Sequence, residues 1–106
     1  MSISIEEMAE QFKLLGDKTR LKIVTILNQQ DMCVCQLVEL LQTTQPNISQ
    51  HLRKLKDAGL VQEERRGQWI FYSLQVAEQP HLHDALQYLP KLEEEVQQKI
   101  NSMLCE

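Results

Sequence analysis

The sequence is poor in the residues that make flexible linkers and large aromatic cores. Its 106 residues include three Gly and three Pro, so long flexible linkers are not expected. Five residues are aromatic, and three of them, Trp69, Phe71 and Tyr72, fall within four positions. The length suits one domain with one hydrophobic core and is too short for two ordinary domains.

Long apolar runs and a basic leader are also missing. No stretch approaches the ~18 uninterrupted apolar residues that span a membrane, and residues 1–7 lack a secretory pattern. We therefore expect a cytoplasmic protein with no membrane partner, in which cysteines remain thiols rather than structural disulfides. There are three cysteines in two separate places, and this odd number favours ligands or reactive groups over a disulfide framework.

The net charge of −4 does not by itself suggest that the chain binds nucleic acid. The charges are, however, unevenly distributed. Residues 44–68 carry five Lys or Arg and three Asp or Glu, a net charge of +2. The rest of the chain carries six bases and twelve acids, a net charge of −6. A basic segment in an acidic protein predicts a local anion site.

Apolar spacing predicts helices in the first half of the chain. One helix spans residues 5–15, and Asp17 can cap a second. A short helix follows, with Asp31 as its expected cap, and a polar turn at 43–45 leads to a helix with Pro46 at its first position. Gly59 is expected to end that helix.

The period then changes from 3.6 to 2, which predicts a hairpin around Arg66 and Gly67, with a last helix interrupted near Pro90. The predicted fold is mainly α with a small β-hairpin, a homodimeric winged helix-turn-helix formed by residues 1–106 as one domain. The helix-turn-helix spans about 33–58 and the wing about 60–74. Terminal helices at 5–15 and 81–104 are expected to form the dimer.

The helix from Pro46 has the composition of a helix that enters the major groove of DNA, with short polar groups first and cations after them. The predicted DNA-binding residues are Thr44, Gln45, Asn47, Ser49, Gln50, His51, Arg53 and Lys54, with Arg65, Arg66 and Gln68 at the wing tip. Two alternatives stay open. The polar side chains can simply be solvated residues on the surface of the helix and the hairpin, and the ring of His51 can instead hydrogen-bond a backbone carbonyl. Two half-sites about 34 Å apart favour a homodimer on double-stranded operator DNA. Alternatively, the apolar stripes of the terminal helices only close the monomer core.

The spacing of Cys33 and Cys35 indicates a site for a soft ion. Residues i and i+2 lie about 200° apart around a helix, so one ion reaches both sulfurs only if the first turn unwinds or Cys33 lies outside it. We therefore expect binding to strain the helix before the recognition helix. Cys105 can complete a three-sulfur site within or across subunits; the alternative is that all three are structural or frayed residues. His81 and His83 are expected at the surface of a helix start.

No enzyme motif is present: the sequence has neither a glycine-rich phosphate loop nor H-E-x-x-H. We expect no enzyme and no obligatory cofactor. A thiol enzyme or a metal-buffering protein that does not bind DNA remains the alternative class.

Five segments together resemble the ArsR/SmtB family of bacterial metalloregulatory repressors, over roughly residues 5–90. They are Asp17-Lys-Thr-Arg-Leu-Lys-Ile, Met32-Cys-Val-Cys-Gln-Leu, Thr44-Gln-Pro-Asn-Ile-Ser-Gln-His-Leu, Leu55-Lys-Asp-Ala-Gly-Leu-Val and Arg66-Gly-Gln-Trp-Ile-Phe-Tyr. The Cys-Val-Cys motif points to the arsenic-responsive branch. The resemblance implies a homodimeric repressor that leaves its operator when As(III) or Sb(III) binds cysteines, so that a resistance operon is transcribed.

The chain departs from that family in three places. Close relatives carry a third cysteine where this chain has Val38, so only ligation by Cys33 and Cys35 carries over. Cadmium and lead sensors add a cysteine near the N-terminus, and none precedes Cys33 here. Zinc sensors place Asp and His on the last helix, where this chain has Val76, Glu78, Tyr88 and Lys91. Another soft metal ion, such as cadmium or lead, and thiol oxidation remain the alternative signals.

Overall fold

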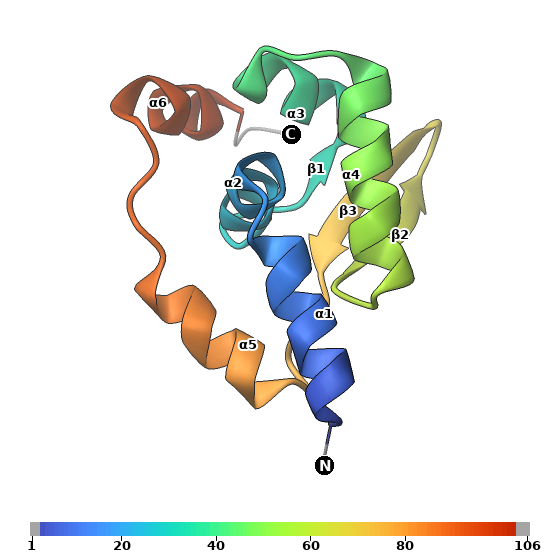
Figure 1. Ribbon diagram of the computed structural model, residues 1–106. Coiled ribbons are helices and arrows are strands. Elements are labelled where there is room, and N and C mark those ends of the chain that lie inside the picture. Colours follow the sequence, from blue (N-terminus) through green and yellow to red (C-terminus); the bar gives the residue numbers. More distant parts are fainter. Residues whose placement is uncertain (1–2, 104–106) are drawn as a thin grey trace.

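The computed structural model describes residues 3–103 as six α-helices, one 3₁₀ helix and a three-stranded antiparallel sheet (Figure 1). In chain order the elements are α1 (Ile5–Leu15), α2 (Lys18–Leu27), β1 (Met32–Cys33), α3 (Val34–Leu41), α4 (Gln45–Asp57), β2 (Val61–Arg66), β3 (Trp69–Leu74), α5 (Pro80–Ala85), η1 (Leu86–Tyr88) and α6 (Glu94–Ser102). The predicted winged helix-turn-helix is confirmed, with one strand more than the predicted hairpin.

Local capping explains where the first two helices begin. Ser4 and Glu7 form a capping box at the start of α1. Asp17 caps α2, as predicted, by accepting a hydrogen bond from the backbone N–H of Arg20 at 3.0 Å. The carboxylate of Asp17 has a lowered pKa, mainly because of this hydrogen bond. This hydrogen bond fixes the residue at which α2 begins.

A three-residue turn, residues 42–44, joins α3 to α4. Gln42 ends α3 in the left-handed region with φ of 52°, and Thr44 caps α4 by accepting from the backbone N–H of Asn47. The turn lies one residue earlier than predicted, so Pro46 is the second helical residue. The C-terminal end of α4 is a Schellman motif. In it Gly59 has φ of 80°, and the backbone N–H of Leu60 donates to the carbonyl oxygen of Leu55 at 2.9 Å.

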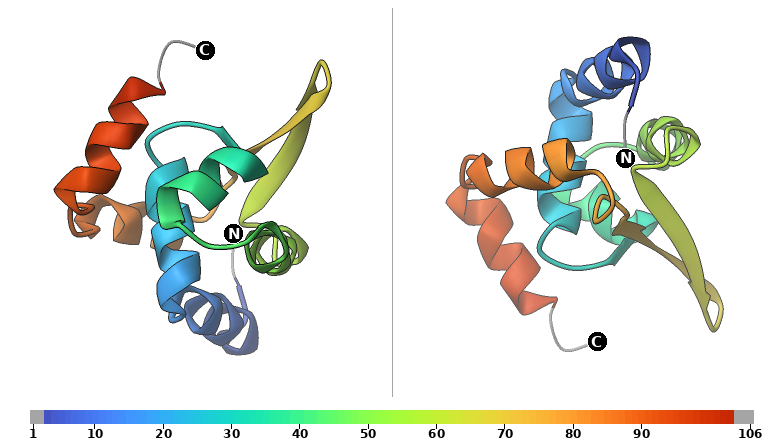
Figure 2. Two further views of the ribbon diagram at one scale, coloured as in Figure 1. Left: turned by 90° about the horizontal axis from the view of Figure 1, so that it is seen from above. Right: turned by 90° about the horizontal axis from the view of Figure 1, so that it is seen from below.

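The wing is the hairpin of β2 and β3, which projects from the body of the molecule (Figure 2). Arg66 pairs with Trp69, so the loop is Gly67 and Gln68, one residue later than predicted; Gly67 has φ of 65°, as a two-residue hairpin loop requires. The unpredicted strand β1 pairs Cys33 with Phe71. Strand β1 thereby ties the segment before α3 to the root of the wing.

The core lies between α2, α3 and α4 and extends to the sheet and the last helices. Its most deeply buried side chains include Ile23, Ile26, Met32, Leu37, Leu40, Ile48, Leu52, Leu55, Leu60, Leu82 and Ile100. The predicted last helix is two separate pieces, because the chain leaves η1 and runs through Pro90 before α6 begins. Figure 1 shows α5 beside α1 and α6 beside α3, so these pieces cover different parts of the core.

Candidate DNA interface and thiol site

Helix α4 presents five of the predicted DNA-binding side chains to solvent. They are Gln45, Ser49, Gln50, Arg53 and Lys54, and all five are exposed. Within residues 3–103 none of them has a side-chain hydrogen bond or an ion pair. Four of them, with Pro46, line a shallow hollow of about 400 Å³ on the outer face of the helix. This face has the amides, hydroxyl and cations that can meet base edges and phosphates.

The remaining predicted residues of this segment have partners inside the protein. Thr44 caps α4, and the amide nitrogen of Asn47 donates to the hydroxyl of Thr43 at 3.0 Å. Nδ1 of His51 lies 3.1 Å from Nη1 of Arg20, rather than beside a backbone carbonyl. Burial lowers the pKa of His51, and the nearby guanidinium of Arg20 acts in the same direction. His51 is therefore neutral at pH 7 and accepts a hydrogen bond that joins α4 to α2.

A second set of contacts connects α4 with the wing. The hydroxyl of Tyr72 donates to Glu63 at 2.8 Å, and the ammonium of Lys56 lies 3.1 Å from the same carboxylate. Burial, together with the acceptor Glu63, raises the pKa of Tyr72 to about 12. The pKa of Glu63 is lowered, mainly by the hydrogen bond from Tyr72. The hydroxyl proton therefore stays on Tyr72, and the carboxylate of Glu63 links both strands of the wing to Lys56 of α4.

The two wing arginines differ in how strongly they are held. Arg65 is exposed, with a long contact of 3.4 Å to the carbonyl oxygen of Gly67. Arg66 contacts Asp31 at 2.7 Å and Glu64 at 2.8 Å, and its guanidinium carbon lies 4.7 Å from the ring centroid of Phe71. Asp31 was predicted to cap α3, and this prediction is wrong: Cys33 is the N-cap residue, and Asp31 binds the wing instead.

The structure brings Cys33 and Cys35 together. Their sulfur atoms lie 2.9 Å apart, well beyond the ~2.05 Å of a disulfide, so both are free thiols. Cys33 has an extended backbone and lies outside α3. This is one of the two conditions under which we expected a single ion to reach both sulfurs. The sulfurs therefore meet without unwinding of α3, and the predicted strain is not needed to bring them together.

One thiol of the pair is buried and the other is exposed. Cys33 is 6% exposed, and its backbone N–H donates to the side chain of Gln36 at 3.0 Å. The hydrogen bond to Cys33 raises the pKa of the exposed Cys35 thiol. A soft ion that binds the pair must therefore displace the thiol protons, which makes its affinity pH-dependent.

No third ligand accompanies the pair among the described residues. No group of three His, Cys, Asp or Glu side chains in residues 3–103 is arranged to hold a metal ion. The predicted third ligand, Cys105, lies outside the described residues. His81 and His83 lie at the start of α5, where Nε2 of His81 binds Gln11 at 2.7 Å.

The thiol pair opens into a hollow of about 710 Å³ between β1, the start of α3 and the wing. Its lining residues are Gln30, Asp31, Cys33, Cys35, Gln36, Arg66, Trp69, Phe71 and Met103. Sequence reasoning singled out the aromatic cluster and the cysteines separately. Only the pairing of β1 with β3 brings them to one place.

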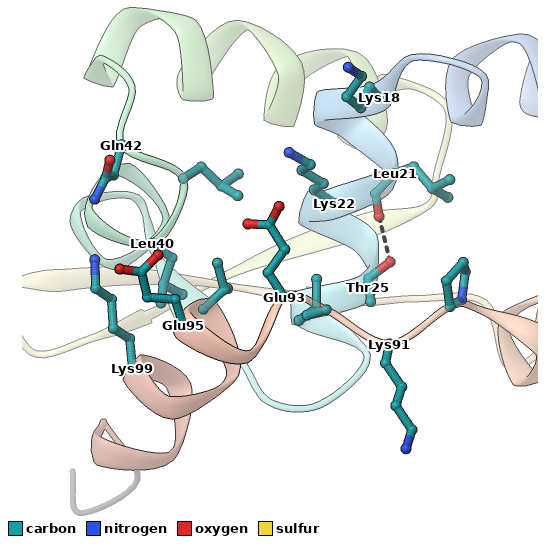
Figure 3. Close-up of a pocket in the computed structure, with 14 residues that line it drawn as sticks. Lys18, Leu21, Lys22, Thr25, Leu40, Gln42, Lys91, Glu93, Glu95 and Lys99 are labelled. Atoms are coloured by element: carbon teal, nitrogen blue, oxygen red, sulfur yellow. Dashed lines mark hydrogen bonds between the residues drawn. The ribbon is translucent and has the colours of Figure 1, made fainter.

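A second hollow, of about 340 Å³, lies between α2, the end of α3 and the segment leading into α6 (Figure 3). Its floor is apolar, and its rim carries lysines and glutamates, including Lys22, Lys99, Glu93 and Glu95. No cysteine or histidine of residues 3–103 lines it. It therefore lacks the soft donors that mark the thiol hollow.

Several large apolar side chains of α1 and η1 are exposed in the described chain. Ile5 and Phe12 on α1 are 83% and 49% exposed, and Tyr88 in η1 is 84% exposed. The buried Gln11 of α1 bonds to Gln79 and His81 and so ties α1 to the start of α5. These are the terminal helices that the sequence predicted for dimerisation.

None of the helices in residues 3–103 is long and apolar enough to cross a membrane. The fold, the exposed polar face of α4 and the projecting hairpin define a winged helix-turn-helix DNA-binding protein. Comparison with known proteins takes this further. Residues 17–63 match the family model described as "Bacterial regulatory protein, arsR family".

Two curated relatives and one solved structure illustrate the similarity. The chain is 40% identical over 76 residues to the arsenic resistance transcriptional regulator ArsR1 of Pseudomonas putida, covering 71% of this chain and 59% of that protein. It is 39% identical over 71 residues to the arsenical resistance operon repressor of Bacillus subtilis, covering 66% and 68%. The homodimeric winged helix-turn-helix DNA-binding domain of a possible ArsR-family regulator from Mycobacterium bovis superposes with a TM-score of 0.69 at 25% identity, covering 78% of this chain and 77% of that one.

The chain belongs to the ArsR family of bacterial transcriptional regulators. The described part of the chain thus has the fold of a DNA-binding transcriptional regulator. The match spans less than two thirds of the length of the Pseudomonas putida relative.

Proposed function

We propose that the protein is a dimeric repressor that binds operator DNA in the cytoplasm and releases it when As(III) or Sb(III) binds Cys33 and Cys35. The observation that carries the proposal is the thiol pair, with sulfurs 2.9 Å apart at the start of the first helix of the helix-turn-helix. Soft thiolates select soft ions, and both thiols are free. The relatives named for arsenic resistance support this choice of ion.

The DNA-binding part of the proposal rests on the face of α4. A major groove admits one helix, and the exposed Ser49, Gln50, Arg53 and Lys54 lie along the side of α4 that faces away from the core. Arg65 at the exposed wing tip is placed to reach the backbone or the minor groove beside it. In this arrangement phosphate contacts fix the position and the polar groups of α4 contact the bases.

The dimer is proposed to form through the exposed apolar surface of α1 and η1. Isolated apolar side chains are common on surfaces, but Ile5 and Phe12 lie on α1, which Gln11 ties to α5, and Tyr88 lies on η1, which directly follows α5. A two-fold axis beside this surface pairs two α4 helices, as two half-sites about 34 Å apart require. The homodimeric Mycobacterium bovis domain supports this assembly.

The contacts at the thiol hollow suggest how ligand binding reaches the DNA. Asp31 precedes β1 directly, and it holds Arg66 of the wing at 2.7 Å. Arg66 also lines the hollow that contains both sulfurs. A ligand on the thiols therefore occupies space beside Arg66 and competes with its contacts, which changes the position of the wing.

Such a switch operates only if the ligand prefers the state with low DNA affinity. A hundredfold loss of DNA affinity corresponds to a coupling free energy of about 2.7 kcal/mol. Binding of the same ligand must then be a hundredfold weaker on the DNA complex than on the free protein. This reciprocity gives a second, independent measurement of the same quantity.

The proposal is tested by fluorescence anisotropy of the reduced protein on DNA from its own upstream region, with arsenite, cadmium and zinc added separately. We expect binding that weakens with salt, because phosphate contacts release counterions, and release by arsenite. Cys33→Ser and Cys35→Ser should bind the same DNA and fail to respond. Release by cadmium or an oxidant alone would instead assign the signal to the alternatives.

Two controls separate the parts of the proposal. A normal response of Cys105→Ser would show that the third position on the ion is not filled by that residue. A full response of Cys33→Ser would show that the sensing site lies elsewhere. Sedimentation equilibrium of Phe12→Glu tests the dimer surface, and a dimer of unchanged stability would contradict it.

A further inference from the structure

The second hollow, between α2, the end of α3 and the segment leading into α6, has no role in the proposed function. It shares no lining residue with the thiol hollow. Its volume of about 340 Å³ is near the lower end of the ~300–1,000 Å³ of small-molecule sites, which are mostly apolar with a few polar groups. Its apolar lining consists of Leu21, Leu40, Leu41, Pro90, Leu92 and Val96. The second hollow therefore has the size and the lining of a site for a small amphipathic molecule.

Lysines from distant parts of the chain gather at this hollow. Outside residues 44–68 the sequence has six Lys or Arg, and four of them line the second hollow: Lys18, Lys22, Lys91 and Lys99. None of these four ammonium groups forms an ion pair with a carboxylate of the described chain. Figure 3 shows Lys18 and Lys22 on the same side of α2, whereas Lys91 points away from them. The fold thus collects positive charge here, in a part of the sequence that is acidic overall.

The energetics of α2 do not explain Lys18 and Lys22. Lys18 is the first residue of α2, at the positive end of the helix dipole, and the first turn of α2 has no acidic residue. Lys22 follows four residues later, so two like charges lie one turn apart, which disfavours the helix. Both side chains are exposed and add nothing to the core. Residues that break local rules in this way are expected at functional sites.

The glutamates at the rim of the second hollow have a structural explanation. Glu93 is the N-cap residue of α6, and Glu95 lies in the first turn of that helix, where negative charge is favourable. Glu95 also precedes Lys99 by four residues, which is the favoured order of opposite charges on a helix. The charge at the rim that the fold leaves unexplained is therefore positive and belongs to α2.

We propose that the second hollow binds a small amphipathic carboxylate, with the carboxylate at Lys18 and Lys22 and the apolar part on Leu21, Leu40 and Val96. Charge-assisted hydrogen bonds from the two ammonium groups orient the ligand. Burial of its apolar part supplies the larger share of the binding free energy. The inference does not depend on the thiol pair, so failure of either claim leaves the other intact.

The position of the second hollow connects it with the recognition helix. Gln42 lines the hollow and ends α3 in the left-handed region, which is unfavourable for a residue other than glycine. A bound carboxylate contacts α2, the end of α3 and this residue together. It therefore stabilises the turn that leads into α4, and we expect DNA affinity to rise.

The binding test titrates butyrate, hexanoate and octanoate into the reduced full chain by calorimetry, below the critical micelle concentration of octanoate. We expect one octanoate per chain, and affinity that rises by up to about fourfold for each added methylene. Octylamine has the same chain length and the opposite charge, and it should bind at least fivefold more weakly than octanoate. Equal binding of octylamine and octanoate would overturn the assignment of a carboxylate.

Amide chemical shifts measured by NMR locate octanoate on the chain. Octanoate should shift the amide resonances of Leu21, Thr25, Leu41 and Gln42, which line the second hollow, and leave that of Trp69 on the wing unchanged. Shifts confined to α1 and η1 would place the binding on the exposed apolar side chains there. That result would overturn the proposal.

Charge variants test the rim of the second hollow. Lys22→Gln should weaken octanoate binding severalfold, and Lys13→Gln, the same change at an exposed position of α1, is the matched control. Glu93→Gln removes the carboxylate that reaches toward Lys22 in Figure 3, and it should tighten octanoate binding. Weaker octanoate binding in Glu93→Gln would overturn the proposed placement of the carboxylate at the lysines.

DNA binding and dimer stability exclude other uses of these lysines. Without octanoate, Lys22→Gln should match the unaltered protein both in DNA affinity and in sedimentation equilibrium. A loss of either would assign Lys22 to the DNA backbone or to the contact between subunits and would overturn the proposal. Saturating octanoate should raise the DNA affinity of the unaltered protein severalfold, measured by anisotropy. An unchanged DNA affinity would overturn the connection with the turn before α4.

Discussion

The outer face of α4 and the wing both carry arginines, but Arg53 of α4 and Arg66 of the wing are held in opposite ways. Arg53 and Lys54 on α4 have no partner within the described chain, whereas Arg66 on the wing contacts Asp31, Glu64 and Phe71. The cations of α4 can therefore contact a polyanion such as DNA, whereas Arg66 is held by contacts beside the thiol hollow. We infer that a ligand on the thiols changes the wing and leaves the chemistry of α4 unaltered.

The largest expected effect is a difference in the free energy of unfolding between substitutions on the two sides of α4. Leu52 is 1% exposed in the core, and its neighbour Arg53 is exposed. Leu52→Ala should lower the free energy of unfolding by about 2–5 kcal/mol, because it removes buried methyl groups and leaves a cavity. Arg53→Ala should change it by less than ~0.5 kcal/mol. Urea denaturation of both variants measures the difference, and equal losses would show that Arg53 has a structural role.

Arg53→Ala should then weaken DNA binding, although it leaves the fold intact. Loss of one phosphate contact reduces affinity severalfold and lowers the slope of log affinity against log salt by about one unit per contact. The ratio of DNA affinities with and without arsenite should not change. Lys99→Ala is the control, since Lys99 lies on α6 beside the second hollow. An altered arsenite response in Arg53→Ala would break the contrast between α4 and the wing.

A smaller effect tests the connection between the thiols and the wing. Asp31→Asn removes the carboxylate that joins the segment before β1 to Arg66, and we expect the arsenite-induced loss of DNA affinity to shrink severalfold. Glu64→Gln removes the other carboxylate partner of Arg66, which lies on the wing itself. Its arsenite response should be retained. Equal behaviour of the two variants, measured by anisotropy, would exclude Asp31 as the connection.

The helix-turn-helix was predictable from the sequence because its signals are local. Asp17 caps α2 by accepting a hydrogen bond from a backbone N–H only three residues later in the chain. Gly59 takes the left-handed backbone conformation directly after the end of α4. The sequence alone assigned Asp31 incorrectly, since its partner, Arg66, is 35 residues away. Strand β1 was missed for the same reason: two residues have no periodicity, and their pairing depends on Phe71 and Tyr72.

The candidate site divides in the same way. Exposure of the polar face of α4 follows from helical periodicity, so those residues could be chosen from the sequence. Convergence of Cys33 and Cys35 depends on whether Cys33 is helical, which the sequence left open. The position of Trp69 and Phe71 beside the sulfurs depends on the register of β1 against β3, and no local pattern encodes that register.

The smallest predicted effect concerns pH and the contact between α2 and α4. His51 accepts a hydrogen bond from Arg20, and the charged groups around its ring are Asp17, Arg20 and Lys54. Burial lowers the pKa of His51 in the folded protein below its ordinary value of 6.5. The unfolded chain therefore binds more protons just below pH 6.5, so stability falls as the pH drops through that window. The slope from this one group is at most ~1.4 kcal/mol per pH unit.

His51→Gln should flatten that dependence between about pH 6.5 and pH 5, because glutamine does not titrate there. Asp17, with its lowered pKa, contributes stability that is lost only near and below pH 3.8, outside this window. His83→Gln is the matched control, since His83 is exposed at the start of α5. Urea denaturation at several pH values measures the slopes. An unchanged slope in His51→Gln would show that the ring of His51 is as solvated as the side chains on the outer face of α4. His51 would then have to be counted with that exposed face and not with the buried side of the helix.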